Sequence, residues 1–194
     1  MSEESKDIFI LGGPNGAGKT TAARVLLPAF LNEHEFLNAD EIAREISPHD
    51  PESAAIAAAR ELILRMRGLI QRNKSFAIET TCSGRSYIPI FKACKEQGWR
   101  FNFLYLWIPS PEISIARVAQ RVMEGGHGIA SDVIHRRFRT SIWNMLHLYL
   151  PLADTAAIYD NSHQQRILIA ERESGLPLRI LDPDRWSRLE ELAR

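Results

Sequence analysis

The stretch Gly12-Gly13-Pro14-Asn15-Gly16-Ala17-Gly18-Lys19-Thr20-Thr21 decides the fold of this 194-residue chain. It contains the pattern G-x-x-x-x-G-K-T, from Gly13 to Thr20. An apolar run, residues 8–11, comes before it, and a helix-forming segment, residues 21–27, comes after it. The order of strand, glycine-rich loop and helix is the sequence signature of a phosphate-binding loop, or P-loop.

A P-loop binds phosphate mainly through its backbone. Glycines let successive N–H groups turn inward around an anion, and the helix that starts near Gly18 points its positive end at the same place. Lys19 can then reach the β- and γ-phosphates, and the Thr20 hydroxyl can ligate Mg²⁺. We therefore predict a site for ATP and Mg²⁺; the alternative is a glycine-rich turn that matches by chance. The predicted nucleotide-binding residues are Gly13, Pro14, Asn15, Gly16, Ala17, Gly18, Lys19, Thr20 and Thr21.

The composition fits one α/β domain over residues 1–194, with 45% hydrophobic and 25% charged residues. The 24 basic and 24 acidic residues balance, so no long nucleic acid is expected as a partner. No apolar stretch is long enough for a membrane span, and the charged start of the chain does not resemble a signal peptide, which favours a cytoplasmic protein. Two cysteines are too few for a metal site and are expected to be reduced thiols.

Alternating strands and helices predict a doubly wound parallel sheet, with ligands at the carboxyl ends of the strands. The expected strands are residues 8–11, 35–37, 76–78, 101–108, 156–159 and 167–170. The expected helices are residues 53–71, 87–97, 110–123, 132–149 and one from about residue 184.

Asp40 follows the second apolar segment and should lie at the same sheet edge as Lys19. A kinase needs a carboxylate near the attacking hydroxyl, and Asp40 is our candidate for this base. Glu41, the next residue, is expected to face away. The alternative for Asp40 is an ordinary helix N-cap.

Glu79 ends a buried type of strand, where a carboxylate is costly without a cation or hydroxyl partners. It could bind substrate hydroxyls or a Mg²⁺-bound water, or it could pair with a structural arginine. Thr80 and Thr81 add neutral hydroxyls beside it, and Arg85 could bring a positive charge to the substrate. A polar, partly anionic acceptor fits this set.

A helix, a glycine-rich tip and a second helix predict a lid at about residues 117–139. Arg117 and Arg121 lie four residues apart on one face of the first helix, and three further arginines lie on the second helix. Arginine suits phosphate because its planar fork bonds two oxygens and keeps its charge. We predict γ-phosphate contacts for Arg121 first and Arg117 next; the alternative is a solvated basic face.

Several stretches together resemble the zeta-toxin-type kinases over about residues 7–162. They are Gly13-Pro14-Asn15-Gly16-Ala17-Gly18-Lys19-Thr20-Thr21, Phe36-Leu37-Asn38-Ala39-Asp40-Glu41-Ile42-Ala43, Ile78-Glu79-Thr80-Thr81, Arg117-Val118-Ala119-Gln120-Arg121-Val122, Gly125-Gly126-His127 and Ile158-Tyr159-Asp160-Asn161-Ser162.

The resemblance implies an ATP-dependent kinase that phosphorylates UDP-N-acetylglucosamine, and it raises an antitoxin protein as a partner. It implies Asp40 as the base, Glu79 and Thr81 as substrate contacts and Lys19 as the phosphate clamp. From its position after the last inner strand, Asn161 is expected to lie against the adenine.

Two other functions stay open from the sequence. One is a different P-loop kinase, acting on a small metabolite or on a nucleic-acid 5′ end. The other is a non-catalytic, nucleotide-dependent switch. A switch needs an acidic residue after a second inner strand to hold Mg²⁺, and the strand at residues 103–108 ends in Pro109 without one. That absence favours a kinase.

Overall fold

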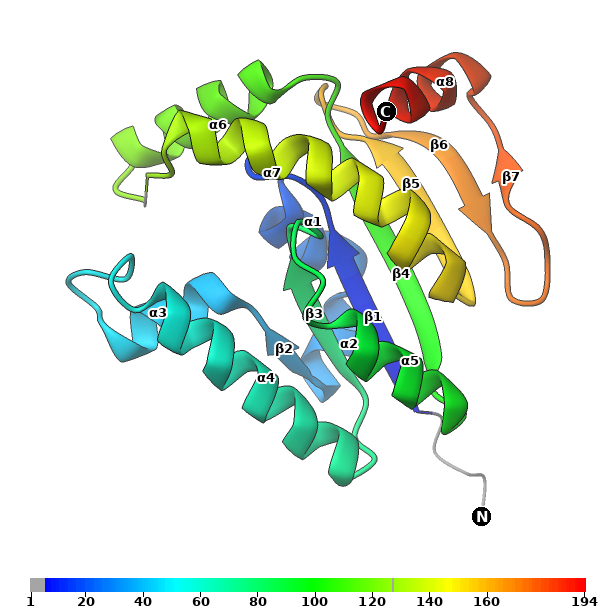
Figure 1. The fold of residues 1–194 in the computed structure, drawn as a ribbon, viewed down its shortest axis with the longest axis horizontal. Coiled ribbons are helices and arrows are strands. Elements are labelled where there is room, and N and C mark those ends of the chain that lie inside the picture. Colours follow the sequence, from blue (N-terminus) through cyan, green and yellow to red (C-terminus); the bar gives the residue numbers. More distant parts are fainter. Residues whose placement is uncertain (1–5, 127) are drawn as a thin grey trace.

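The computed structural model describes residues 6–126 and 128–194. A seven-stranded sheet in the order β2-β3-β1-β4-β5-β6-β7 forms its centre (Figure 1). The strands are β1 Asp7–Gly12, β2 Glu35–Leu37, β3 Phe76–Thr80, β4 Arg100–Trp107, β5 Thr155–Asp160, β6 Ile167–Arg172 and β7 Arg179–Ile180. The helices are α1 Lys19–Leu26, α2 Pro28–Glu33, α3 Ala39–Ile46, α4 Ala55–Gln71, α5 Ile88–Glu96, α6 Pro111–Met123, α7 Ser131–Asn144 and α8 Pro183–Leu192.

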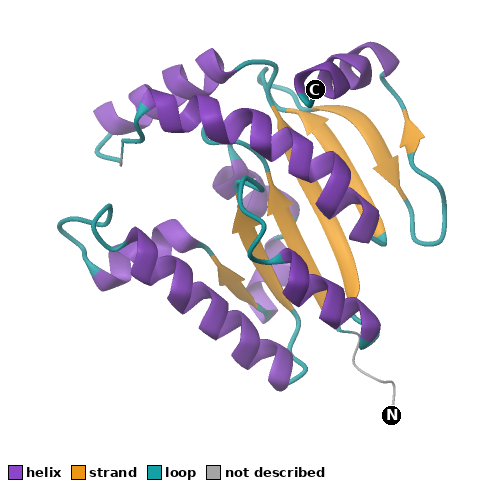
Figure 2. Ribbon diagram, in the orientation of Figure 1, coloured by secondary structure: helices purple, strands orange, loops and turns teal. Residues whose placement is uncertain are grey.

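Strands β2, β3, β1, β4 and β5 are parallel, and helices cover both faces of the sheet (Figure 2). Helices α4, α5 and α7 cross one face, while α1 and α2 lie behind the other (Figure 1). Burial on both faces explains why the inner strands are almost continuously apolar. In β3, for example, Phe76, Ala77 and Ile78 are all buried. The α/β class expected from the sequence is confirmed, with a sheet that is mostly parallel.

The far end of the sheet corrects the expectation of a fully parallel arrangement. β6 pairs antiparallel with β5, and β7 pairs antiparallel with β6. The connection between β5 and β6, residues 161–166, is too short to carry a crossover helix, so the chain must turn straight back. The short elements α2 and β7 were not predicted from the sequence.

The helix expected at residues 132–149 also differs from the prediction. α7 ends at Asn144 and continues as a π-helical turn, Met145–Tyr149, followed by a 3₁₀ turn, Leu150–Leu152. The last apolar residue of this stretch still reaches the core. Tyr149 is buried, and its ring is stacked on Phe103 at a centroid distance of 5.8 Å. Among the described residues, no helix is both apolar enough and long enough to cross a membrane.

Candidate functional site

The P-loop joins the end of β1 to the start of α1 and needs glycine at two positions. Gly18 is the N-cap of α1 and has a left-handed backbone with φ 81°. A Cβ on Gly18 would lie 2.8 Å from Asn161 Nδ2, and one on Gly13 would collide with the Leu106 carbonyl oxygen. The loop therefore passes close to the ends of β4 and β5 and leads into the N-terminus of α1, an arrangement that fits the phosphates of a nucleotide.

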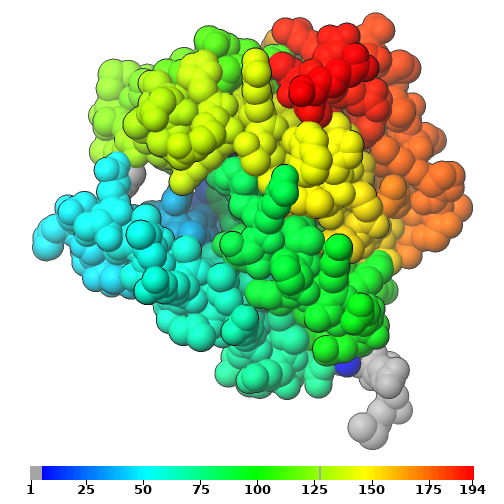
Figure 3. Space-filling model, viewed as in Figure 1, coloured from blue at the N-terminus to red at the C-terminus, as the bar shows by residue number. Residues whose placement is uncertain are grey.

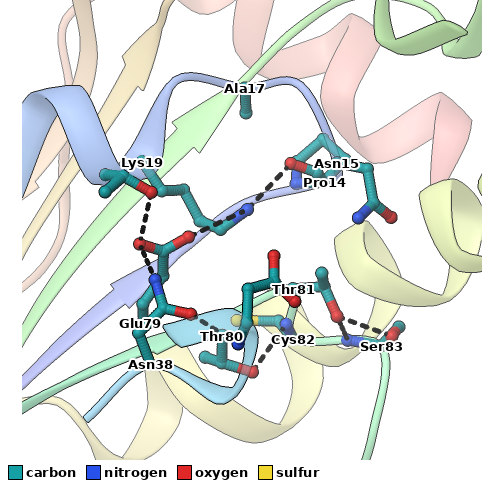
Figure 4. Close-up of polar contacts among 12 residues, drawn as sticks. Pro14, Asn15, Ala17, Lys19, Asn38, Glu79, Thr80, Thr81, Cys82 and Ser83 are labelled. Atoms are coloured by element: carbon teal, nitrogen blue, oxygen red, sulfur yellow. Dashed lines mark hydrogen bonds and ion pairs between the residues drawn. The ribbon is translucent and has the colours of Figure 1, made fainter. Parts of the chain in front are cut away.

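Lys19 lies at the first turn of α1 and is 7% exposed. Its Nζ donates to the Pro14 carbonyl at 3.1 Å and lies 3.9 Å from Glu79 Oε1 (Figure 4). One contact lies within the P-loop and the other at the end of β3, so the ammonium group is held beside the loop, where the phosphates of a nucleotide would lie.

Glu79 is the meeting point of three elements. Its Oε2 accepts the Thr20 hydroxyl at 2.8 Å and Asn38 Nδ2 at 3.0 Å, while Oε1 faces Lys19 (Figure 4). The side chain is only 10% exposed. Burial raises the pKa of Glu79 above its usual value; the Lys19 charge and the Thr20 hydrogen bond oppose this, and the Asp40 charge adds to it.

These contacts change the assignment of Glu79. Its charged neighbour is Lys19 and not the structural arginine that the sequence left as an alternative. The carboxylate and the Thr20 hydroxyl offer two oxygens side by side, which is the kind of ligand that Mg²⁺ prefers. Of the two functional roles predicted for Glu79, the position favours contact with a Mg²⁺-bound water over contact with substrate hydroxyls, and both stay predictions.

The structure also corrects one sequence argument against a switch. That argument sought an acidic residue at the end of β4. β3 flanks β1 on the other side, and Glu79 supplies the carboxylate there. The absence of an acidic residue after β4 therefore does not separate a kinase from a switch.

Asn38, and not Asp40, caps helix α3. The Asn38 side chain accepts the backbone N–H of Asp40 at 2.8 Å. Asp40 is exposed on the first turn of the same helix, whereas Glu41, expected to face away, is half-buried. The alternative of Asp40 as an ordinary N-cap is therefore excluded. Its role as base stays a prediction.

The loop after Glu79 carries the predicted substrate contacts. The Thr81 and Ser83 hydroxyls are hydrogen-bonded to each other at 2.7 Å (Figure 4). Arg85 extends toward α7, where its Nε donates to Asn144 Oδ1 at 3.3 Å and its guanidinium lies 4.9 Å from the Trp143 ring centroid. Thr81 lies close to Glu79 in the chain, whereas Arg85 is directed to the lid helix.

Arg117 contacts backbone carbonyls of the P-loop and of the loop after β5. Its Nη1 donates to Gly16 O at 3.2 Å, and its Nη2 donates to Asn161 O at 2.9 Å and Ser162 O at 3.0 Å. These bonds tie the lid helix α6 to the P-loop and to the loop after β5. They favour a positioning role for Arg117 rather than the predicted γ-phosphate contact.

Arg121 lies at the end of α6, partly buried against the glycine-rich tip. Its carbonyl accepts the Gly126 N–H at 2.8 Å, and a Cβ on Gly126 would come within 2.6 Å of Arg121 Cγ. Gly126 is thus required for the close packing of the tip on this arginine. His127, part of the sequence resemblance, lies outside the described residues.

Asn161 touches the P-loop directly. Its Nδ2 donates to Ala17 O at 2.7 Å, and its N–H donates to Trp107 O at 2.8 Å. The neighbouring Asp160, 3% exposed, accepts both the N–H and the hydroxyl of Ser162 and pairs with Arg185 of α8 at 3.0 Å. A contact between Asn161 and adenine stays a prediction.

Sequence reasoning missed the roles of Asp160, Arg185 and Asn38, and it did not single out the side chain of Asn15. Asn15 is 8% exposed, and its Oδ1 is buried without a hydrogen-bond partner. Its carbonyl accepts the Ser114 hydroxyl of α6 at 2.6 Å. A buried polar atom without a partner is unusual and is consistent with a loop built to meet a ligand. Only Asn38 had a signal in the sequence, as an N-cap type of residue just before a helix.

The surface is hollowed beside these residues. Figure 3 shows a hollow between the cyan segment of α3 and the yellow-green helix α7, with the blue N-terminal part of the chain at its floor. The P-loop, the end of β3 and the start of α3 thus face a common space at the carboxyl edge of the parallel strands.

A family model described as "AAA domain" matches residues 8–144. This chain belongs to that family. A protein of Haemophilus influenzae, described as uncharacterized, is 36% identical over 135 residues, which cover 70% of this chain and 94% of that protein.

Two solved structures resemble the fold. The crystal structure of AvrRxo1-ORF1:AvrRxo1-ORF2 with sulphate ions has a TM-score of 0.77 and 16% identity, covering 98% of this chain and 64% of the matched chain. This chain therefore spans less than two thirds of that one. A structure of the PezAT chromosomal toxin–antitoxin system of Streptococcus pneumoniae has a TM-score of 0.59 and 18% identity, covering 88% of this chain and 72% of that one. The resemblance to zeta-toxin-type P-loop kinases is confirmed at the level of the fold.

Proposed function

We propose that this protein is an ATP-dependent kinase that transfers the γ-phosphate of ATP to a hydroxyl of a small polar acceptor. One observation carries the proposal: Lys19, Thr20 and Glu79 meet at the carboxyl edge of the sheet. Asp40 does not cap α3 and is exposed in the first turn of that helix. The two carboxylates can then serve different purposes. Glu79 would face Mg²⁺ and the phosphates, and Asp40 would face the acceptor.

The residues present fit ATP and Mg²⁺. Lys19 and the amides of the glycine loop would supply positive charge to the phosphates. Thr20 and Glu79 would hold Mg²⁺, which would neutralise developing charge on the phosphates. One crystal structure of the AvrRxo1-ORF1:ORF2 complex contains ATP, which supports ATP as the donor here.

Asp40 takes the acceptor proton in the proposed reaction. The acceptor oxygen forms a bond to the γ-phosphorus, the bond from that phosphorus to the β,γ-bridging oxygen breaks, and ADP leaves with the electron pair. Lys19 stabilises the charge that builds on the phosphates during transfer. Arg121 of the lid is proposed to add charge at the γ-phosphate, and Arg117 to keep the lid helix in register with the P-loop.

UDP-N-acetylglucosamine is the first acceptor to test, because the sequence resembles the zeta-toxin-type kinases. We propose Thr81 and Arg85 as acceptor contacts, since both lie on the loop that follows Glu79. A nucleic-acid 5′ end is a weaker candidate, because the formal net charge of the chain is zero.

A protein partner is also proposed. We expect this protein itself to act in the cytoplasm. AvrRxo1-ORF1 crystallised with ORF2, and PezAT is a toxin–antitoxin system. A partner that restrains this chain in the way of an antitoxin is consistent with those two assemblies.

The test is phosphoryl transfer from γ-labelled ATP to a metabolite extract and to purified UDP-N-acetylglucosamine. The proposal predicts label in a small polar product that requires both Mg²⁺ and Lys19. Tight ATP binding without transfer to any acceptor would instead support a nucleotide-dependent switch, which the position of Glu79 also permits.

A further inference from the structure

The loop after β3, residues 82–85, is hydrogen-bonded to the end of α7 and to the π-helical turn that follows it. Asn144 Nδ2 donates to the Cys82 carbonyl at 2.7 Å, and Asn144 Oδ1 accepts Arg85 Nε at 3.3 Å. The Tyr149 hydroxyl donates to the Gly84 carbonyl at 3.3 Å. Asn144 and Tyr149 are 0% and 1% exposed. Two buried side chains therefore bond three successive parts of one short loop.

This loop needs such support because its backbone is strained. Cys82 has φ 56°, a left-handed conformation that is uncommon for residues other than glycine. Its thiol lies against β1, since a Cβ on Gly12 would be 2.7 Å from Cys82 Sγ. A strained residue persists only where its surroundings fix it, and such residues cluster at functional sites.

The π-helical turn explains how Asn144 and Tyr149 reach the same loop. In a continuous α-helix, residues five apart point about 140° away from each other. In a π-turn the hydrogen bonds run from i to i+5, so residues five apart point much closer to the same side of the helix than they do in an α-helix. The turn spans Met145–Tyr149, and the Leu150 N–H bonds to the Met145 carbonyl across it. An uninterrupted α-helix here would turn one of the two side chains away.

We infer that Asn144 and Tyr149, brought to one face by the π-turn, are positioning residues that fix the 82–85 loop for acceptor binding. The catalytic meaning of this inference rests on the proposed kinase function. The loop carries Arg85 and starts just after Thr81, so its shape sets the geometry of the acceptor contacts. The bonds also join the 82–85 loop to helix α7, so a movement of α7 would move the loop with it.

Limited proteolysis tests the structural part without any substrate. Trypsin can cut after the exposed Arg85 only when the loop leaves its restraints. Tyr149→Phe removes the hydrogen bonds of the Tyr149 hydroxyl to the Gly84 carbonyl and to the Thr80 side chain, and it should raise the rate of cleavage after Arg85 about fivefold. Asn144→Leu removes two hydrogen bonds to the 82–85 loop and should raise that rate about tenfold or more. Cleavage after Arg100, in the central strand β4, serves as the internal reference for global unfolding.

Tyr105→Phe is the matched control. The Tyr105 hydroxyl bonds Ser141 Oγ at 2.8 Å, so this variant likewise removes a buried hydroxyl that is hydrogen-bonded, without touching the loop. It should leave cleavage after Arg85 unchanged. Equal increases in Tyr105→Phe and Tyr149→Phe, or no increase in Tyr149→Phe, would overturn the inference. If Asn144→Leu fails to fold, Tyr149→Phe alone decides it.

Kinetics test the catalytic part once labelled ATP has revealed an acceptor. Tyr149→Phe should raise the KM for the acceptor about fivefold and leave the Kd for ATP unchanged, with Tyr105→Phe again as the control. A rise in the Kd for ATP with an unchanged acceptor KM would contradict the inference. Absence of transfer by the wild type would refute the proposed function, whereas unchanged proteolysis in Tyr149→Phe would refute the positioning role.

Discussion

The two edges of the parallel sheet carry similar polar residues, yet they use them differently. At the amino edge, Arg100 donates to both oxygens of Asp7 at 3.0 and 2.7 Å, and Asn102 Nδ2 donates to Asp7 Oδ1 at 3.1 Å. The Thr155 hydroxyl bonds Asn102 Oδ1 at 2.8 Å, and the Asp7 N–H bonds Ser75 Oγ at 2.9 Å. A cavity of about 670 Å³ opens beside this network. The polar groups there bind one another.

At the carboxyl edge, by contrast, the polar groups do not all bind one another. Glu79 is buried with a raised pKa, the Oδ1 of Asn15 is buried without a partner, and Asp40 is exposed. The buried carboxylate and the unpaired amide oxygen cost stability in the free protein, and a ligand bound at the proposed site would offset that cost. The larger cavity therefore does not mark the proposed nucleotide site. The buried carboxylate of Glu79 and the unpaired Oδ1 of Asn15 mark it.

The largest effect should come from removing the phosphate clamp. Lys19→Ala should abolish ATP turnover, because no other side chain of the loop supplies its charge to the β- and γ-phosphates. The fold should remain intact, since glycines shape the loop, and circular dichroism will check this. Normal turnover in a folded Lys19→Ala protein would remove the P-loop from the mechanism.

The next effect separates the two carboxylates of the carboxyl edge. Asp40→Asn keeps the shape of the side chain but removes the base, so the rate of phosphoryl transfer should fall by roughly 10² to 10⁴. ATP affinity should hardly change, because Lys19, Thr20 and the loop amides still hold the phosphates. Steady-state transfer and ATP binding are the measurements. Full activity would move the role of base to Glu79.

At the amino edge, substitution should change stability and nothing else. Asp7→Ala leaves the Asn102 amide and the Arg100 guanidinium without their shared partner and should lower the free energy of unfolding by about 1 to 3 kcal/mol. Urea denaturation measures the loss. The Kd for ATP should stay the same, and a large increase in it would break the division between the two edges.

A smaller effect of opposite sign is expected at Glu79. Because burial raises its pKa in the folded protein, ionised Glu79 costs stability above that pKa, and the cost disappears below the unfolded value near 4.5. Without Mg²⁺ or nucleotide, Glu79→Gln should therefore raise the Tm at neutral pH by a few degrees.

The difference in Tm between Glu79→Gln and the wild type should shrink as the pH falls toward 4. Differential scanning calorimetry at several pH values, with EDTA present, measures it. A Tm for Glu79→Gln below that of the wild type at neutral pH would show that the carboxylate stabilises the free protein, contrary to its raised pKa.

The sequence predicted the P-loop, the class of fold and most strands, because glycine spacing and apolar runs are local signals. It could not predict that Glu79 contacts Thr20, since those residues are 59 positions apart and meet only through the strand order. The cap of α3 was assigned to the wrong residue as an alternative, because Asn38 and Asp40 are both common capping residues.

The lid shows the limit of sequence reasoning more sharply. Spacing placed Arg117 and Arg121 on one helix face, but only the structure showed that Arg117 bonds the carbonyls of Gly16, Asn161 and Ser162. The π-turn after Asn144 was likewise invisible, because it changes the direction of side chains without changing the apolar pattern.

The most direct test of the central claim compares Asp7→Ala and Asp40→Asn in one experiment, with urea stability and phosphoryl transfer measured on both. The account predicts that Asp7→Ala loses stability but, below its unfolding transition, transfers phosphate at the wild-type rate. It predicts that Asp40→Asn keeps the wild-type stability and loses transfer by roughly 10² or more. Transfer lost in folded Asp7→Ala, or retained in Asp40→Asn, would contradict it.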